Sequence, residues 1–207
     1  MQIYDISLPI DPALASWPGD TPFTLEWIST KSQGEPVNLG SIKMSPHLGT
    51  HADAPYHFDS FGASIDQLSL GPFIGPATVI DLAGKQVINV GDLDRAVVTS
   101  TPRLLIKTGA WKDYSQFPED IPLIAADVPE HLRRCGVILL GLDLASVDAI
   151  YSKDLANHHA IHANGIHILE SLFLKDVPPG QYELIALPLR LVGADASPVR
   201  AILRSLD

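Results

Sequence analysis

Residues 45–58 read Ser45-Pro46-His47-Leu48-Gly49-Thr50-His51-Ala52-Asp53-Ala54-Pro55-Tyr56-His57-Phe58. The three histidines and Asp53 all occupy odd positions, so an extended backbone would project them to one side. A straight strand would also spread them over about 33 Å, at about 3.3 Å per residue, which is too far for one site. Gly49 and Pro55 can bend the chain, and a helix is disfavoured because it would have to contain both. The segment therefore predicts a bent strand that gathers four polar side chains.

Histidine and aspartate at this spacing suggest a metal site. Imidazole nitrogens and carboxylate oxygens are the usual zinc ligands outside cysteine-rich sites. His51 and Asp53 lie two residues apart on one face and form a natural pair, with His47 as a third candidate. The alternative is a polar loop with three unrelated histidines and Asp53 as a turn residue. Four such groups beside glycine, threonine and proline favour the metal site.

A second group of polar residues lies in the last quarter of the chain and consists of His158, His159, His162, His167 and Glu170. In a strand, Glu170 would share a buried face with Ile166 and Ile168. A buried carboxylate is costly without a partner, so Glu170 should be paired or bound to a metal. His158 and His162 are four residues apart and can share a helix face. The alternative for these histidines is a solvated, histidine-rich helix end.

Together the two groups can supply three histidines and two carboxylates, with one histidine to spare. These are more ligands than a single tetrahedral zinc ion binds. They suit two ions bridged by carboxylates, roughly 3.5–4 Å apart. The chain has one cysteine, Cys135, so a cysteine-based structural zinc site is excluded. A catalytic ion would lower the pKa of a water to about 7 and polarise a carbonyl, while a histidine outside the ligand set moves protons.

The pattern of the whole chain predicts a mixed α/β domain, spanning residues 1–207, with a curved sheet at its centre. The 207 residues suffice for one sizeable core, and the 17 prolines and 15 glycines suggest many short elements. Strands are expected at 3–9, 23–27, 38–45, 77–82, 103–107, 137–142, 166–170, 182–188 and 199–203. Helices are expected at 92–98, 129–135 and 158–163, with Asp92, Asp127 and Asn157 as their respective N-caps.

The charge and hydropathy of the chain argue against two classes of binding partner, nucleic acids and membranes. The formal net charge of -10 repels phosphate backbones, so no nucleic-acid partner is expected. The N-terminus has neither the basic start nor the apolar core of a signal peptide, and no apolar run approaches the ~18 residues of a transmembrane helix. With a single cysteine, the sequence predicts a cytoplasmic protein without membrane contact.

The segment 47–58 resembles the H-x-G-T-H-x-D-x-P-x-H motif of the cyclase family, which includes bacterial kynurenine formamidases, and it matches every fixed position. The resemblance covers nearly the whole chain in order, through the segments 5–10, 17–22, 141–148, 165–170 and 182–195. The segment Trp17-Pro18-Gly19-Asp20 and the C-terminal segment point to the formamidase branch. One departure is Leu144-Ala145, where the family usually has threonine and proline after an aspartate. It bears on the substrate more than on the chemistry.

The resemblance implies a swivelling β/β/α fold with a barrel-like central sheet flanked by helices. It also implies a homodimer and a site for two divalent metal ions, usually zinc, with manganese as an alternative. Carried over by motif position, the metal ligands are His47, His51, Asp53, His158 and Glu170. Asp53 would bridge the two ions, and Glu170 would contact both. His158 matches by its twelve-residue distance from Glu170, with the adjacent His159 as the alternative.

The resemblance also implies a reaction. His57 would donate and accept protons, and Trp17 would contact the aryl ring of the substrate. The expected reaction is hydrolysis of the linear amide of N-formyl-L-kynurenine to L-kynurenine and formate, in tryptophan degradation. One alternative is another amide hydrolase of the family, such as an isatin hydrolase. An alternative of a different class is a non-catalytic metal- or ligand-binding module, against which the presence of His57 argues.

Overall fold

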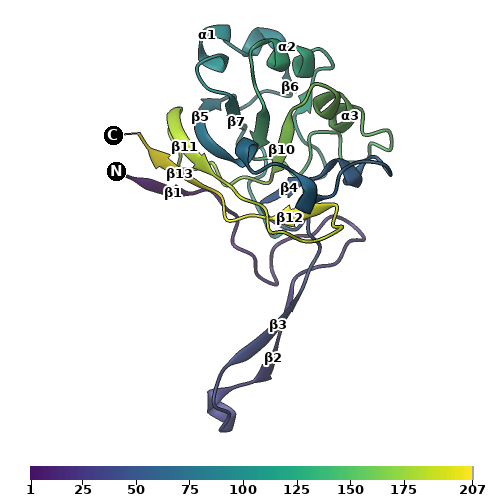
Figure 1. The fold of residues 1–207 in the computed structure, drawn as a ribbon, viewed down its shortest axis with the longest axis vertical. Helices are drawn as coiled ribbons and strands as arrows, with labels where there is room; N and C mark the ends of the chain where they lie inside the picture. Colours follow the sequence, from purple (N-terminus) through teal and green to yellow (C-terminus); the bar gives the residue numbers. More distant parts are fainter. Residues whose placement is uncertain (207) are drawn as a thin grey trace.

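The computed structural model describes residues 1–206 and has a nine-stranded mixed sheet at its centre, in the order β1-β13-β11-β5-β7-β9-β10-β4-β12 (Figure 1). The strands are β1 (Ile3–Asp5), β4 (His51–Asp53), β5 (Ile74–Asp81), β7 (Arg103–Lys107), β9 (Leu139–Leu142), β10 (His167–Glu170), β11 (Gly180–Ile185), β12 (Ala196–Pro198) and β13 (Ile202–Ser205). The run β5-β7-β9-β10 is parallel, and the outer pairings are antiparallel. The expected curved mixed sheet is confirmed.

The curl of the sheet follows from its strand order. Pro198 ends β12 at one edge of the sheet, and Ile202 begins β13 next to the opposite edge. Four residues of extended chain span about 14 Å at most. The two ends of the strand order must therefore lie close together, which bends the sheet into a half-barrel. The strand expected at 199–203 is displaced towards the C-terminus, since β13 covers Ile202–Ser205 and residues 199–201 connect it to β12.

The core lies on both faces of the sheet because side chains alternate along each strand. On β7, Leu104 and Ile106 face one side, and Leu105 faces the other. The first side packs against Leu132 of α2 (Val128–Arg134) and Ile161 of α3 (Ala156–Ala163). Figure 1 shows these two helices and α1 (Arg95–Val98) at the end of the molecule opposite the hairpin of β2 (Thr24–Ser29) and β3 (Leu39–Lys43). The helices thus cover this face of the sheet, and α3 lies beside the part that contains β10.

Two of the expected helix caps are wrong. In α1 the cap is Asp94, whose side chain accepts from the backbone N–H of Ala96, while Asp92 ends a preceding 3-10 turn. Helix α3 begins one residue before Asn157, after Leu155 in a left-handed conformation (φ 44°). Asp127 does stand at the N-cap of α2, but its side chain makes no capping hydrogen bond.

The start of α3 is instead held by an acid from another segment. The carboxylate of Asp148 accepts from the backbone N–H of Asn157 at 2.9 Å and from that of His158 at 3.1 Å. The side chain of Asn157 donates to the carbonyls of Ile124 and Val147. A carboxylate at a helix N-terminus satisfies orphan donors and complements the helix dipole. Asp148 therefore fixes where His158 lies.

Two smaller sheets complete the fold. One pairs β6 (Val87–Ile88) with β8 (Leu123–Ile124), and the other is the hairpin of β2 (Thr24–Ser29) and β3 (Leu39–Lys43). The hairpin confirms the expected strands near 23–27 and 38–45. The expected strand at 3–9 is shorter, since β1 ends at Asp5, and β11 covers 180–185 rather than 182–188. Among residues 1–206, none of the helices has the length and apolar character needed to cross a membrane.

Candidate metal centre

The first site segment is built around the short strand β4. Its register places His51 opposite Glu170 of β10 and Asp53 opposite Ala196 of β12. Ala52 points to the apolar core, so its two neighbours point to the other face of the sheet. The chain bends on both sides of β4, at Gly49 with φ of 72° and at the 3-10 turn Pro55–His57. The bends expected from the glycine and the proline are present.

One group of ligand atoms comes from this segment alone. His47 Nδ1 lies 3.2 Å from Asp53 Oδ1, and His51 Nε2 lies 3.3 Å from the same oxygen. Atoms of the three residues lie within 4.8 Å of one another. Ligands about 2.0–2.1 Å from a tetrahedral zinc ion are themselves about 3.3 Å apart. The spacing of this group is that of a metal site.

A second group shares Asp53 with the first. Its other oxygen, Oδ2, lies 3.6 Å from His158 Nε2, which lies 3.6 Å from Glu170 Oε1. Glu170 Oε2 in turn approaches His51 Nε2 at 3.5 Å, so this carboxylate reaches towards both groups. All of these side chains are buried. The expected burial of Glu170 is correct.

Some buried polar atoms of these two groups have no hydrogen-bond partner, and this shows whether a metal ion would fit between them. Within residues 1–206, three of the four buried side-chain polar atoms without a hydrogen-bond partner are His51 Nε2, Asp53 Oδ1 and Asp53 Oδ2. Leaving such atoms unpaired is costly, and buried polar groups are almost always satisfied. His51 Nε2 and Asp53 Oδ1 belong to the first group, and Asp53 Oδ2 faces His158 in the second, so a cation in each group would satisfy all three. The donor set of imidazole and carboxylate suits a divalent ion such as zinc.

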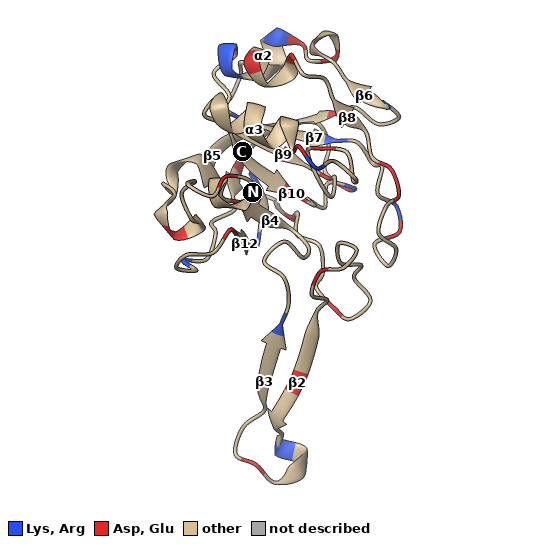
Figure 2. Ribbon diagram, turned by 90° about the vertical axis from the view of Figure 1, so that its right-hand side faces the viewer, with Lys and Arg blue, Asp and Glu red and all other residues tan. Residues whose placement is uncertain are grey.

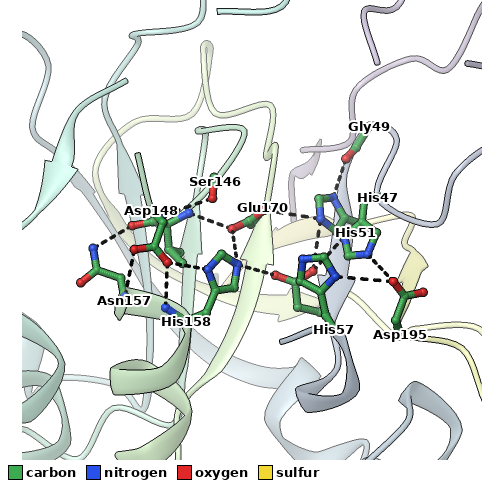
Figure 3. A network of polar contacts seen from close by, with 12 residues as sticks. His47, Gly49, His51, His57, Ser146, Asp148, Asn157, His158, Glu170 and Asp195 are labelled. Carbon is green, nitrogen blue, oxygen red and sulfur yellow. Dashed lines mark hydrogen bonds and ion pairs between the residues drawn. The ribbon is translucent and has the colours of Figure 1, made fainter. Parts of the chain in front are cut away.

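The other nitrogen of each histidine is held by an acceptor outside the two groups. A ligand histidine normally donates its remaining N–H in this way, which fixes the tautomer and the ring orientation. The pairs are His47 Nε2 with Asp195 Oδ2 at 3.0 Å, His51 Nδ1 with the Gly49 carbonyl at 2.9 Å, and His158 Nδ1 with Asp148 Oδ2 at 2.7 Å (Figure 3). The nitrogens that face the groups are therefore left with lone pairs for a metal.

The carboxylates of the two groups raise the pKa of the histidines beside them. Burial opposes protonation of His51, but the carboxylates of Asp53 and Glu170 outweigh it and raise the pKa of His51 to about 10. Burial likewise opposes protonation of His158, yet Asp148 and Asp53 raise its pKa to about 10. Without a metal, these carboxylates hold protons on the histidines.

His57 lies beside the two groups but outside both. Its ring centroid is 4.1 Å from that of His47 and 5.8 Å from that of His158, and its Nδ1 lies 3.5 Å from Asp195 Oδ2. Partial burial and the neighbouring His47 lower the pKa of His57. A neutral imidazole at the edge of a metal site can accept a proton.

His159 and His162, the two histidines next to His158 in the sequence cluster 158–170, lie away from these ligand atoms. His158 is buried, whereas His159 is exposed and packs its ring against Phe58 at 5.3 Å. His162 also packs against Phe58, at 5.7 Å, on the same helix face as His158. The geometry favours His158 over His159 as the ligand.

A cavity of about 480 Å³ opens onto the site. His57, His158 and Glu170 line one part of it, and aromatic side chains line another, namely Trp17, Trp111 and Phe117. The rings of Trp17 and Phe117 meet edge-on at 5.0 Å. Apolar clefts with a few convergent polar groups are typical of small-molecule sites, and this one suits an aromatic ligand. Ala145, one of the two residues that depart from the family pattern, also lines the cavity, while Leu144 is buried in the core.

Several residues around the site were not assigned roles from the sequence. Asp148 and Asp195 belong to segments that resemble the family, but nothing local shows that they contact histidines ten and 148 residues away. Trp111 and Phe117 lie in a loop without a regular pattern. Their roles depend on contacts between distant segments of the chain.

The chain is similar to known proteins over most of its length. The family model described as "Putative cyclase" matches residues 4–149. Kynurenine formamidase of Geobacillus thermodenitrificans is 49% identical over 98% of this chain and 97% of its own, and that of Bacillus cereus is 44% identical over the same shares. A solved structure described as a predicted metal-dependent hydrolase from Bacillus stearothermophilus covers 98% of this chain and 97% of its own at TM-score 0.81 and 28% identity.

A further structure, isatin hydrolase A from Ralstonia solanacearum, has a TM-score of 0.82 at 22% identity and covers 98% of this chain and 91% of its own. At 22% identity, this similarity supports only the fold of the chain. The histidine motif, the fold and the curated relatives agree with one another, and the chain therefore belongs to the cyclase family.

Proposed function

We propose that this protein hydrolyses N-formyl-L-kynurenine to L-kynurenine and formate. The single observation that carries the proposal is a cavity in which aromatic walls adjoin buried histidines and carboxylates. The aromatic part fits the aryl ring of the substrate, and the polar part fits its formyl amide. Identity of 42–49% to eight curated kynurenine formamidases, over at least 98% of this chain, supports this substrate.

The two groups of ligand atoms would hold two divalent ions, zinc first and manganese as the alternative. His47, His51 and Asp53 would hold one, and Asp53, His158 and Glu170 the other. Bound there, the ions would supply Lewis acidity to the formyl carbonyl and to water. Asp148 and Asp195 would orient His158 and His47 through the hydrogen bonds to their outer nitrogens.

The protein side chains would perform the proton transfer and the positioning. His57 would accept a proton from the attacking water and deliver it to the aniline nitrogen as the carbon–nitrogen bond breaks. Trp17 and Phe117 would pack against the aryl ring and exclude water from it. We also infer a homodimer, which the family resemblance implies, and a cytoplasmic location, where Cys135 would stay reduced.

Purified protein loaded with zinc should hydrolyse N-formyl-L-kynurenine with kcat of order 1–10³ s⁻¹, the usual range for enzymes. The absorbance of kynurenine reports the reaction, and the control is the same preparation after chelation and desalting. Isatin is the comparison substrate, because it presents a cyclic amide to the same cavity. Metal-loaded protein that opened isatin but left N-formyl-L-kynurenine intact would contradict the proposal. Protein inert to both would favour the non-catalytic alternative.

Zinc binding to the ion-free protein should release protons at pH 7. His51 and His158 have pKa values raised to about 10, so both carry protons at neutral pH, and a metal requires neutral imidazole. The affinity should therefore rise as the pH rises towards 10, by about tenfold per pH unit for each proton displaced. Calorimetric titration in two buffers of different ionisation enthalpy measures the protons released. A release of none at pH 7 would be incompatible with protonated ligands in the ion-free site.

A further inference from the structure

The segment 143–148 follows β9 and supports the metal centre at its C-terminal end. The backbone N–H of Val147 donates to Glu170 Oε1 at 2.8 Å. Asp148 accepts from His158 Nδ1 at 2.7 Å, so two successive residues of the segment contact the proposed ligands. The acid that begins the segment contacts a different part of the chain.

That acid, Asp143, binds the backbone at the point where β7 ends. Strands β7 and β9 are parallel neighbours, so the chain leaves both strands at the same edge of the sheet (Figure 2). The buried carboxylate of Asp143 accepts from the backbone N–H of Thr108 at 2.8 Å, from its hydroxyl at 2.6 Å and from the backbone N–H of Gly109 at 2.8 Å. Gly109 has φ of 61°, and successive N–H groups in such a turn form a concavity that binds an anion. The carboxylate of Asp143 fills this concavity.

The loop that continues from Gly109 forms much of the aromatic part of the cavity. Trp111 and Phe117 line the cavity, and their ring centroids are 5.7 Å apart. The Trp111 ring also packs against Tyr114 at 5.2 Å, and its Nε1 donates to two carbonyl groups of the same loop, each at 3.0 Å. Residues 108–117, all of which the structure describes, belong to no helix or strand. The loop is therefore held by these side-chain contacts and by its attachment to Asp143.

The same loop contacts the segment that contains Trp17. The backbone N–H of Ala15 donates to the carbonyl of Tyr114 at 2.8 Å, and the rings of Trp17 and Phe117 meet at 5.0 Å. A shift of the loop would therefore move Trp17 together with Phe117. The position of the whole aromatic part of the cavity depends on how this loop is attached to the sheet.

The contact between Asp143 and the loop stabilises both partners. Burial raises the pKa of Asp143 because it penalises the charge, and the hydrogen bonds from Thr108 and Gly109 oppose this shift. Without the carboxylate, the buried N–H of Thr108 would lose its acceptor, which is costly. Asp143 is not among the described residues that line the cavity. Any effect of Asp143 on a bound substrate must therefore act through the loop.

We propose that Asp143 is a positioning residue for binding of the aryl ring. It attaches the loop 108–117 to the sheet and thereby places the three aromatic side chains of the cavity, Trp17, Trp111 and Phe117. The proposal rests on the proposed function, in which these side chains bind the aryl ring of the substrate. Asp148, at the opposite end of the same segment, orients a metal ligand instead.

The kinetics of Asp143→Asn test this assignment. Asparagine keeps the shape of the side chain but replaces one acceptor oxygen with a donor, which would face the N–H of Thr108 or Gly109. KM for N-formyl-L-kynurenine should rise by about tenfold or more while kcat changes by less than about twofold, because aryl contacts bind the ground state and the transition state alike. Metal content should stay at the wild-type level. An unchanged KM in a variant shown to be folded by far-UV circular dichroism would overturn the proposal.

Two further acids give the matched comparisons. Asp81 ends β5 of the same sheet and accepts from the backbone N–H of Ala83 at 2.9 Å, but it lies at the surface and outside the cavity lining. Asp81→Asn should leave KM and kcat unchanged. Asp148→Asn should instead lower the affinity for zinc by about 10–100-fold, the usual effect of losing the partner of a ligand histidine. Loss of metal from Asp143→Asn with an unchanged KM would contradict the separate roles of the two acids.

Substitutions of Thr108 test the contact from the side of the loop. Thr108→Val removes the hydroxyl that donates to Asp143 at nearly constant volume, and Thr108→Ser keeps it. We expect Thr108→Val to raise KM in the same direction as Asp143→Asn, and Thr108→Ser to retain the wild-type KM. Equal KM values for the valine and serine variants would count against the contact.

The fluorescence of Trp111 provides a readout that needs no turnover. Trp111 is buried, so acrylamide should quench it poorly in the wild type and more strongly in Asp143→Asn. The increase should disappear in a Trp111→Phe background, which assigns the signal. Increased quenching would support the positioning role even in a protein inert to N-formyl-L-kynurenine, so a failure of the proposed reaction is distinct from a failure of this proposal. Unchanged quenching of Trp111 in Asp143→Asn would overturn the proposal.

Discussion

Replacement of Asp53 by asparagine is expected to remove metal from both groups of ligand atoms and to reduce formamidase turnover by at least about a thousandfold. Asp53 is the residue that the two groups share, with Oδ1 directed to His47 and His51 and Oδ2 directed to His158. Asparagine has the same shape but one acceptor oxygen and no charge. The change therefore weakens both groups while preserving volume.

Metal content measured after desalting, by elemental analysis, provides the decisive readout. Asp59→Asn is the matched control, because Asp59 lies six residues away and accepts only from the backbone N–H of Phe61 at the surface. The control should keep full metal content and turnover. Retention of both ions by a folded Asp53→Asn protein would show that the carboxylate does not bridge the two groups.

The sequence suffices to predict which residues of the 47–57 segment converge, because the argument is local. Alternation along a strand puts His51 and Asp53 on one face, and Gly49 and Pro55 are the residues that can bend the chain on either side. The same reasoning identifies Glu170 as a buried acid that needs a partner.

Contacts between distant segments could not be predicted in this way. The choice between His158 and His159 depends on Asp148, which binds the start of α3 and sets the phase of the helix against the site. Sequence spacing alone favours Asn157 as the cap, since asparagine is a common capping residue. Tertiary structure overrides that preference here. Similarly, Asp195 reaches His47 only because β12 pairs with β4.

The hairpin of β2 and β3 could not be predicted fully either, for the same reason. The alternation in 38–45 predicts a strand, and this is correct, but it does not reveal that the partner of the strand is β2 alone. Apolar residues on one face would equally suit a strand that covers the core of its own chain. The three-dimensional structure is needed to show that the hairpin projects from the body instead of covering that core (Figures 1 and 2).

Replacement of His57 by alanine is expected to lower kcat by about 10²–10⁴-fold while the metal content stays at the wild-type level. His57 contributes no atom to either group around Asp53, so its removal leaves all five proposed ligands in place. The aromatic wall formed by Trp17 and Phe117 is also untouched, and KM should change much less than kcat.

His159→Ala is the control for this variant, because His159 is an exposed histidine that packs against Phe58 and lies outside the ligand groups. It should leave kcat and metal content unchanged. Near-normal turnover of His57→Ala would contradict the proton-transfer role.

The metal measurement on His57→Ala also decides between two roles that the geometry allows. Atoms of His47, His57 and Asp195 form a third cluster within 4.8 Å, so His57 has the surroundings of a ligand as well as of a base. The structure favours the base, because Asp195 Oδ2 is the hydrogen-bond acceptor of His47 Nε2, and the side chain of Asp195 is 39% exposed. A ligand role would predict loss of metal in proportion to loss of activity. Loss of activity alone, with full metal content, would leave His57 as the group that moves the proton.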